Sequence, residues 1–554
     1  MVKKLFTVLL MFALLIAAGC TKDESTGGKE GSSSGSSDSK EPVTFTYFNA
    51  ASPGKDGNTN ETTIGKKFED QTGVNFKTEY LVGDINTKIG TMIASGKYPD
   101  VLVPDIAIDK VLDAGAFIDL TELIDEHAPN IKKLYGPFLN QMKDKDGKIN
   151  FIPFAAKQGF IKDPNITQGA FWIQRGILKE AGYPEIKTLD EYLALIEDYQ
   201  KKHPEVNGAS TIGFTALTYD WRFFALSNVP NHLAGYPNDG EVIVDMKTHK
   251  TDVYADNDVT KQYLKELNEL NSKGLFDKES FVANYDEYLA KLASGRVLGF
   301  FDYGWQVQQA LDNLKVAGND DLRYMPLPIT FDGGKDQYID PPAFINNRGV
   351  GITVSAKDPV RIIKYFDNMV KEENQKLMFW GIEDETYSVD DKGRFFQTPE
   401  QFAKTSDDKF RDESGLNTFE YYWPMGDMLY SDGNAWVPGK QPEVAQVAYT
   451  DGDKTILEKY GVKVFSDLFA DPDDRPWYPT WSAVIEQGSE AQIFGQRKTD
   501  LTKVYFPKLV LAKPNDFDKV WDEYIKEFKT LNVKALEDTM DKVVEDRIKA
   551  AEKK

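Results

Sequence analysis

Apolar and polar positions beyond residue 42 follow two alternating patterns. Three short runs rich in apolar, aromatic and β-branched residues predict strands, at 43–48, 74–80 and 101–103. Between these runs, apolar residues at helical spacing predict helices at 64–71 and 85–93, followed by Gly73 and Gly96 as helix stops. Because strand and helix alternate at this spacing, the pattern predicts a parallel sheet with helices on its faces.

The middle and the end of the chain are more helical. Thr188 and Glu191 have the spacing of a capping box, and Asp358-Pro359 has the pattern of a helix start. A buried strand is expected at 297–301, and the C-terminal region predicts two amphipathic helices, at 520–528 and 533–548. The fold class expected from these patterns is α/β.

Length, charge and cysteine content narrow the function. About 510 residues beyond residue 41 exceed what one core usually organises, so two or more lobes are expected. The formal net charge of −22 argues against nucleic-acid binding, which needs a basic surface. The chain has a single cysteine, which excludes an internal disulfide and argues against thiol catalysis. Its four histidines stand far apart and form no metal-binding pair.

The N-terminal region has the layout of an export signal. Lys3 and Lys4 precede an apolar run at 5–16 and the small residues 17–19, and Cys20 follows. This order resembles a bacterial lipobox, which implies a signal peptide at 1–19 and a lipid on Cys20. Residues 20–41, rich in Gly and Ser, are expected to be a flexible tether.

Two other interpretations of this region remain open. One is a plain signal peptide with a chance cysteine, and the other is a membrane-spanning anchor. The apolar run is short for a span, which needs about 20 residues. The preferred expectation is therefore a protein anchored by lipid at the extracellular face of the cell membrane.

Motifs spread along the chain resemble one protein family. The segments that carry the resemblance include FEDQTGV at 68–74, ASGKYPDVLV at 94–103 and LASGRVLGFF at 292–301, with further matches at 115–131, 172–196, 267–281 and 366–394. In this order they resemble the large extracellular solute-binding lipoproteins of bacterial ABC importers, in the oligosaccharide-type branch of Gram-positive bacteria.

The resemblance implies a periplasmic-binding-protein-like fold, with two α/β lobes joined by a multi-segment hinge and a ligand cleft between them. Lobe 1 is expected at 42–160 and 335–395, and lobe 2 at 161–334 and 396–554. The implied partners are an oligosaccharide and the transmembrane subunits of an ABC permease. A monomer that needs no cofactor and touches the membrane only through its lipid is expected.

One segment departs from the family pattern. Some members carry a calcium loop after the helix that ends here near residue 202. The sequence at 203–208, HPEVNG, retains only Glu205 as a carboxylate. Calcium takes six to eight oxygen ligands, so no metal is expected here.

A sugar site combines flat aromatic faces with a few placed polar groups. The ends of predicted strands favour Asn49, Asp105, Asp302, Tyr303 and Trp305. Further candidates stand where aromatic and polar residues adjoin: Trp172, Arg175, Trp221, Arg222, Trp423 and Trp477. Trp380 and Trp521 lie in helical patterns and are expected in the core.

Charge on the ligand is left open by the sequence. Four basic residues could bind a carboxylate if the sugar were a uronate: Lys157, Arg175, Arg222 and Arg348. Structural ion pairs are the competing interpretation, because the chain has 88 acidic residues.

Two other functions compete with capture by a binding protein. A glycoside hydrolase would need two carboxylates roughly 5 to 10 Å apart, and no catalytic signature surrounds any such pair. A peptide-binding or adhesive surface lipoprotein could share the fold. The sequence favours a binding protein over an enzyme.

Overall fold

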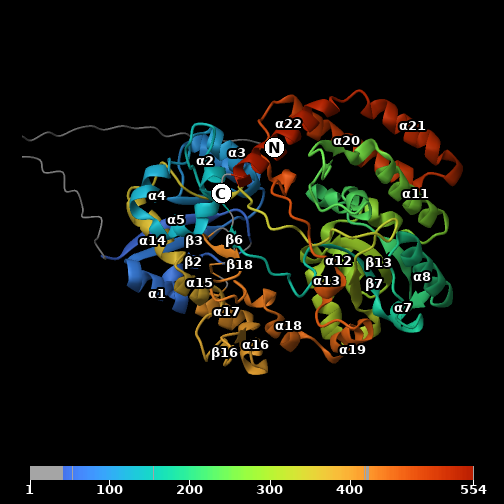
Figure 1. Ribbon diagram of the computed structural model, residues 1–554, viewed down its shortest axis with the longest axis horizontal. Coiled ribbons are helices and arrows are strands. Elements are labelled where there is room, and N and C mark those ends of the chain that lie inside the picture. Colours follow the sequence, from blue (N-terminus) through green and yellow to red (C-terminus); the bar gives the residue numbers. More distant parts are fainter. Residues whose placement is uncertain (1–40, 53, 154, 417, 420–422, 553–554) are drawn as a thin grey trace, which may run out of the picture. The chain divides into compact units, whose positions relative to one another are not determined.

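The computed structural model describes residues 41–52, 54–153, 155–416, 418–419 and 423–552 (Figure 1). The predicted signal peptide at 1–19, Cys20 and nearly all of the tether at 20–41 lie outside these residues. Within the described part of the chain, no helix is both long and apolar enough to cross a membrane.

The first sheet has six strands in the order β2-β3-β1-β4-β15-β5. Its strands are β1 (Val43–Asn49), β2 (Gly57–Asn58), β3 (Val74–Tyr80), β4 (Val101–Val103), β5 (Ile152–Pro153) and β15 (Gly349–Ile352). β1 pairs in parallel with both β3 and β4, whereas β15 runs antiparallel to β4. The three predicted strands and their parallel pairing are confirmed.

Helix boundaries in this region follow local signals. Helix α1 (Thr63–Thr72) starts at the Thr62 side chain, which accepts from the Gly65 N–H, and α2 (Ile85–Ser95) starts in the same way at Asp84. Gly73 and Gly96 end these helices in the left-handed conformation that glycine adopts without a Cβ penalty.

Further helices cover the first sheet or pack beside it (Figure 1). They are α3 (Ile108–Asp113), α4 (Thr121–His127), α5 (Pro129–Tyr135), α6 (Leu139–Met142), α14 (Pro359–Met369), α15 (Glu372–Phe379), α16 (Pro399–Thr405), α17 (Asp408–Ser414) and α18 (Pro442–Ala448). Asp358 accepts from the Arg361 N–H and Pro359 opens α14, as the sequence predicts.

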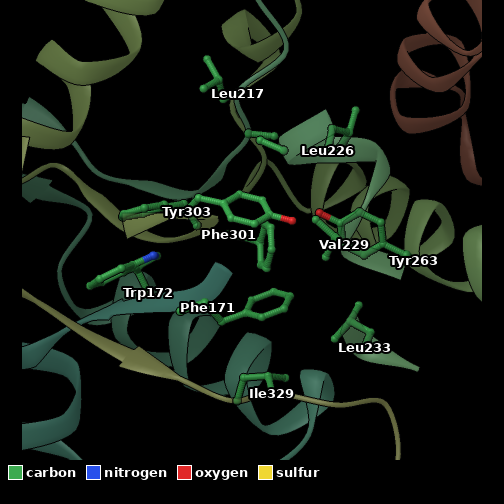
Figure 2. Close-up of a cluster of buried hydrophobic side chains, with 14 of the residues drawn as sticks. Phe171, Trp172, Leu217, Leu226, Val229, Leu233, Tyr263, Phe301, Tyr303 and Ile329 are labelled. Atoms are coloured by element: carbon green, nitrogen blue, oxygen red, sulfur yellow. The ribbon is translucent and has the colours of Figure 1, made fainter. Parts of the chain in front are cut away.

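The second sheet has four strands in the order β10-β13-β7-β14. They are β7 (Gly169–Gln174), β10 (Ile212–Thr215), β13 (Val297–Tyr303) and β14 (Tyr324–Leu327). β10 and β13 are parallel, and β7 runs antiparallel to β13 and β14. The predicted strand at 297–301 is the buried β13, and Figure 2 shows side chains from β7 and β13 within this core.

The helices that follow pack around the second sheet and contribute to this core. They are α7 (Arg175–Glu180), α8 (Leu189–Lys202), α9 (Phe224–Ser227), α10 (Val229–Leu233), α11 (Asp258–Ser272), α12 (Tyr285–Ala293), α13 (Gly304–Ala317), α19 (Asp451–Tyr460), α20 (Glu490–Leu511), α21 (Phe517–Phe528) and α22 (Val533–Glu552). The capping box of Thr188 and Glu191 and the two C-terminal amphipathic helices are confirmed.

The remaining strands form two-stranded sheets. They are β6 (Ala156–Gln158) with β18 (Gly426–Met428), β8 (Glu205–Val206) with β9 (Ala209–Ser210), β11 (Val242–Val244) with β12 (Thr251–Val253), and β16 (Ser388–Val389) with β17 (Phe395–Phe396). β6 and β18 run parallel, and their pairing joins two segments that are far apart in the chain.

The buried side chains separate into cores that contain discontinuous segments. One core draws on residues 166–339 and 445–544, and the cores around the first sheet draw on residues 45–156 and 344–444. Trp423, for example, stacks on Tyr47 of β1 with ring centroids 4.2 Å apart. We therefore propose that the chain returns to lobe 2 near residue 445, rather than after residue 395 as the sequence suggested.

Candidate ligand-binding site

Two neighbouring parallel strands place the main aromatic cluster. β10 ends at Thr215 and β13 ends at Tyr303, and the strands pair in register. Their carboxyl ends therefore lie at one edge of the sheet, which is where open α/β sheets bind ligands. The segment after β10 supplies Trp221 and Phe224, and Trp305 follows β13 directly.

These three rings form a stepped aromatic surface. Trp221 and Trp305 are nearly parallel, with centroids 6.0 Å apart and planes 8° apart. Phe224 lies 5.8 Å from Trp221 and 6.3 Å from Trp305. If the three rings were stacked in one column, the two outer centroids would be about twice as far apart as neighbouring centroids. The three distances are instead similar, so the rings are offset sideways from one another. Trp221 is 58% exposed and Trp305 is 50% exposed, so they present aromatic area to a ligand.

Arg222 contacts this surface through its guanidinium group. Its guanidinium lies 4.6 Å from the ring centroid of Trp221 and 4.1 Å from that of Tyr285. Its Nη1 also donates to Asp220 Oδ2 at 2.8 Å. The cation–π contacts and the ion pair together hold the guanidinium next to the Trp221 ring.

A buried carboxyl group, that of Asp302, lies near the end of β13. Asp302 accepts hydrogen bonds from Tyr288 Oη at 2.8 Å, Gln306 Nε2 at 2.7 Å and the Tyr303 N–H at 2.7 Å. Burial raises the pKa of Asp302 to about 7, although these donors act in the opposite direction. Asp302 thus ties the end of β13 to α12 and to the first turn of α13, which carries Trp305.

Two predicted residues, Trp172 and Tyr303, belong to the core that Figure 2 shows. Trp172 is buried, and its Nε1 donates to the carbonyl oxygen of Asp302 at 3.0 Å. Tyr303 is buried, contacts Phe224 at 5.1 Å between ring centroids, and lies within hydrogen-bond distance of His232 Nε2. Tyr303 therefore packs against the aromatic surface, whereas Trp172 bonds to the end of β13. Direct ligand contact by either residue stays a prediction.

Three of the four predicted basic residues are engaged in ion pairs. Arg175 is buried and contacts Asp320 at 2.7 Å and Asp453 at 2.5 Å. Arg348 contacts Asp105 at 3.1 Å, beyond the end of β4. Arg222 contacts Asp220, as described above. Structural ion pairs, the alternative to binding of a ligand carboxylate, therefore account for these three arginines. Lys157 differs, because its ammonium has no hydrogen bond or ion pair with any described residue.

Other predicted residues lie apart from the aromatic surface. Asn49 is buried at the end of β1, where its Oδ1 accepts from the Ala51 N–H and shapes the following turn. Trp423 is buried in the core of the first sheet. Trp477 is buried in the second core beside His249. Ligand contact by these residues remains a prediction.

The expected core tryptophans are confirmed. Trp380 is buried and donates from Nε1 to the Ala435 carbonyl oxygen at 3.0 Å, and Trp521 is buried against Tyr524. Trp521 lies on the apolar face of the amphipathic helix α21, whereas Trp380 directly follows α15 and packs against Tyr387 and Phe395.

Sequence reasoning missed two contributors to the aromatic surface. Phe224 lies three residues after Trp221, a spacing that brings side chains together in a helical turn, and this signal was available. Tyr285 opens α12, far from Arg222 in the sequence, and no local pattern connects them.

The hairpin β8–β9 occupies the position of the degenerate calcium loop. Its turn carries Asn207 and Gly208 with positive φ, and His203 lies 2.7 Å from Glu180. Among the residues that the structure describes, no group of three or more His, Cys, Asp or Glu side chains could hold a metal ion. The expectation of a loop without metal stays a prediction.

A second feature is a cavity of about 730 Å³ beside the first sheet. Its walls are mostly apolar, and its charged lining residues are Lys157, Arg411, Asp427 and Lys440. Volumes of this size are typical of small-molecule sites. The structure thus offers an exposed aromatic surface beside the second sheet and a cavity beside the first sheet.

Comparison with known proteins identifies the class. The profile of the bacterial extracellular solute-binding protein family matches residues 63–382, more than half of the chain, and the chain belongs to this family. The periplasmic-binding-protein-like α/β fold is confirmed. The protein is a binding protein and not an enzyme, as the sequence favoured.

Individual relatives extend this result. The chain is 26% identical over 488 residues to the fructooligosaccharide ABC transporter substrate-binding protein FusA of Streptococcus pneumoniae, covering 85% of this chain and 81% of that one. It is 20% identical over 484 residues to lipoprotein LipO of Bacillus subtilis, covering 83% and 87%. The solved structure of S. pneumoniae FusA with kestose aligns with a TM-score of 0.65 at 20% identity, over 92% of this chain and 100% of that one.

Proposed function

We propose that this protein captures an oligosaccharide in the cleft between its lobes and delivers it to the transmembrane subunits of an ABC permease. The observation that carries the proposal is the exposed, stepped surface of Trp221, Phe224 and Trp305 at the carboxyl ends of β10 and β13. The relationship to FusA, a fructooligosaccharide-binding protein, supports the same ligand class.

The aromatic surface suits the faces of sugar rings. C–H groups on one face of a pyranose or furanose ring form apolar patches that can lie flat on Trp221 and Trp305, while hydroxyl groups stay directed to polar neighbours. Ligand bound first to one lobe would add contacts with the other lobe. It would therefore stabilise the closed arrangement by its difference in affinity for the two states.

We also propose attachment by lipid at Cys20, after removal of residues 1–19. The order of the signal and the relationship to lipoprotein LipO support this anchor at the extracellular face of the cell membrane. A monomer tethered by residues 20–41 could then meet its permease without further contact with lipid. Cys20→Ala should release the protein from the membrane fraction into the medium, and retention of this variant would contradict the anchor.

Calorimetric titration of purified protein tests the ligand class. The panel consists of kestose, maltotriose, cellotriose and an alginate trimer, each added at low and at high salt. We expect at least one trisaccharide to bind and to be recovered intact. Because bound ligand stabilises the native state by mass action, it should also raise the melting temperature. Failure of every sugar to bind would overturn the proposal.

A further inference from the structure

The cavity beside the first sheet has two kinds of wall. Apolar side chains form most of it, and they come from segments that are distant in the sequence: Ala155, Ala343, Ile345, Phe379, Phe402 and Val437 are among them. The remainder is polar: Lys157 and Asp427 lie where β6 and β18 pair, Lys440 contacts Asp427, and Gln397, Thr405, Ser406 and Arg411 come from other segments. An apolar enclosure with a few polar groups is the usual composition of a small-molecule site.

Strand pairing places the polar groups. Lys157 of β6 and Asp427 of β18 are direct partners across the parallel pair, so their side chains lie on the same face. Lys440 Nζ contacts Asp427 Oδ1 at 2.6 Å. The Lys157 ammonium has no such partner among the described residues, although it is half-buried and burial lowers its pKa. A ligand oxygen that accepts from this ammonium would form a charge-assisted hydrogen bond, which is stronger than one between neutral groups.

The charges around Lys157 are close to balanced. Lys157 and Lys440 are opposed by Asp427 and by Asp340, whose carboxylate interacts electrostatically with Lys157. Arg411, which also lines the cavity, already has an interaction of its own. A ligand carboxylate placed at Lys157 would therefore also meet Asp427, and like charges at close range are unfavourable.

We infer that this cavity is a subsite for an uncharged sugar residue, with Lys157 as a specificity-determining donor and Asp427 as its neighbouring acceptor. Adjacent hydroxyl groups of a sugar can each donate and accept, so one can accept from Lys157 while the next donates to Asp427. The apolar wall takes the C–H face of the ring. The inference rests on the proposed function and adds to it a second position and a preference for neutral sugars.

Two variants test the subsite. Lys157→Met removes the ammonium and keeps the apolar stem, and the loss of a charge-assisted hydrogen bond should weaken binding of the neutral trisaccharides about tenfold. Gly439 lines the cavity, and a Cβ there meets no atom within 4 Å, so Gly439→Phe should occupy part of the cavity without a backbone clash. It should weaken binding by about tenfold or more.

Gly90→Phe is the matched control. Gly90 is exposed on α2, a helix that packs with the first sheet, and a Cβ added at Gly90 also meets no atom within 4 Å. It should bind as the unmodified protein does. In the unmodified protein, the alginate trimer should bind more weakly than the best neutral trisaccharide by about tenfold or more.

The outcomes separate this inference from the proposed function. If no trisaccharide of the panel binds the unmodified protein, the proposed function fails. If trisaccharides bind and Trp305→Ala weakens them, but either Lys157→Met or Gly439→Phe leaves binding unchanged, the subsite is overturned while the proposed function stands. Tighter binding of the alginate trimer than of every neutral sugar overturns the preference for uncharged ligands.

Discussion

Replacement of Trp305 by alanine should weaken oligosaccharide binding about tenfold. A tryptophan side chain has roughly 200 Å² of surface, and Trp305 is 50% exposed, which leaves about 100 Å² accessible. A sugar ring covers one face, or about half of that area. At about 25 cal/mol per Å², the lost contact is about 1.3 kcal/mol, close to a tenfold change in the dissociation constant.

The assay is calorimetric titration with the tightest-binding trisaccharide of the panel. Trp305→Phe is the matched control, because phenylalanine keeps an aromatic face at the same position and should bind within about threefold of the unmodified protein. Thermal unfolding of each variant checks the fold. Since Trp305 is half exposed, loss of its stacking on Trp221 and Phe224 should cost only about 1 kcal/mol of stability.

One result would refute this reasoning. If Trp305→Ala is folded and still binds the trisaccharide with unchanged affinity, the aromatic surface is not where the sugar lies. Equal losses in Trp305→Ala and Trp305→Phe would instead show that binding depends on the indole N–H rather than on the ring face, and would contradict the area argument.

Three further predictions concern stability. Burial raises the pKa of Asp453, but the Arg175 guanidinium outweighs this effect together with other partners, and the pKa is lowered to about 2. Asp453→Asn should therefore reduce the free energy of unfolding by roughly 2 kcal/mol at neutral pH. That cost should shrink between about pH 4 and pH 2, as urea unfolding can measure, and a cost that does not change with pH contradicts the linkage. Trp423→Ala removes the stack on Tyr47 and should destabilise by about 3 to 5 kcal/mol in the same assay, and a loss under about 1 kcal/mol would speak against a core role. Because burial raises the pKa of Asp302 to about 7, the folded chain retains a proton that the unfolded chain releases near pH 4, and stability falls as pH rises through this window. Asp302→Asn should reduce that slope, and equal slopes in both proteins would disprove the assignment.

The α/β elements of the first sheet could be predicted from sequence because their signals are local. β-branched and aromatic residues in β1 and β3, and the left-handed glycine after α1, act within a few positions of one another. The same holds for the capping box that starts α8. Each of these signals specifies a conformation without reference to the rest of the chain.

The candidate site was only partly predictable. The sequence favours Trp305 because it follows a predicted strand, and Trp221 and Arg222 because aromatic and polar residues adjoin there. These residues come together because β10 and β13 are parallel neighbours. Trp172 and Trp423 carried similar local signals, yet both are buried. A single tryptophan has the same sequence pattern whether its exposed face will meet a sugar or another ring.

The amino-acid sequence by itself determined the helices and strands of the first sheet, their order and the family. Hydrophobic periodicity, helix caps and family motifs each depend only on residues that lie close together in the chain. Only the tertiary structure decided which side chains face solvent and which charges are paired. Arg175 forms ion pairs with Asp320 and Asp453, and the strand that carries Lys157 pairs with the strand that carries Asp427. Both arrangements join segments more than a hundred residues apart. Such pairings depend on how whole sheets and helices pack, and no local pattern contains that information.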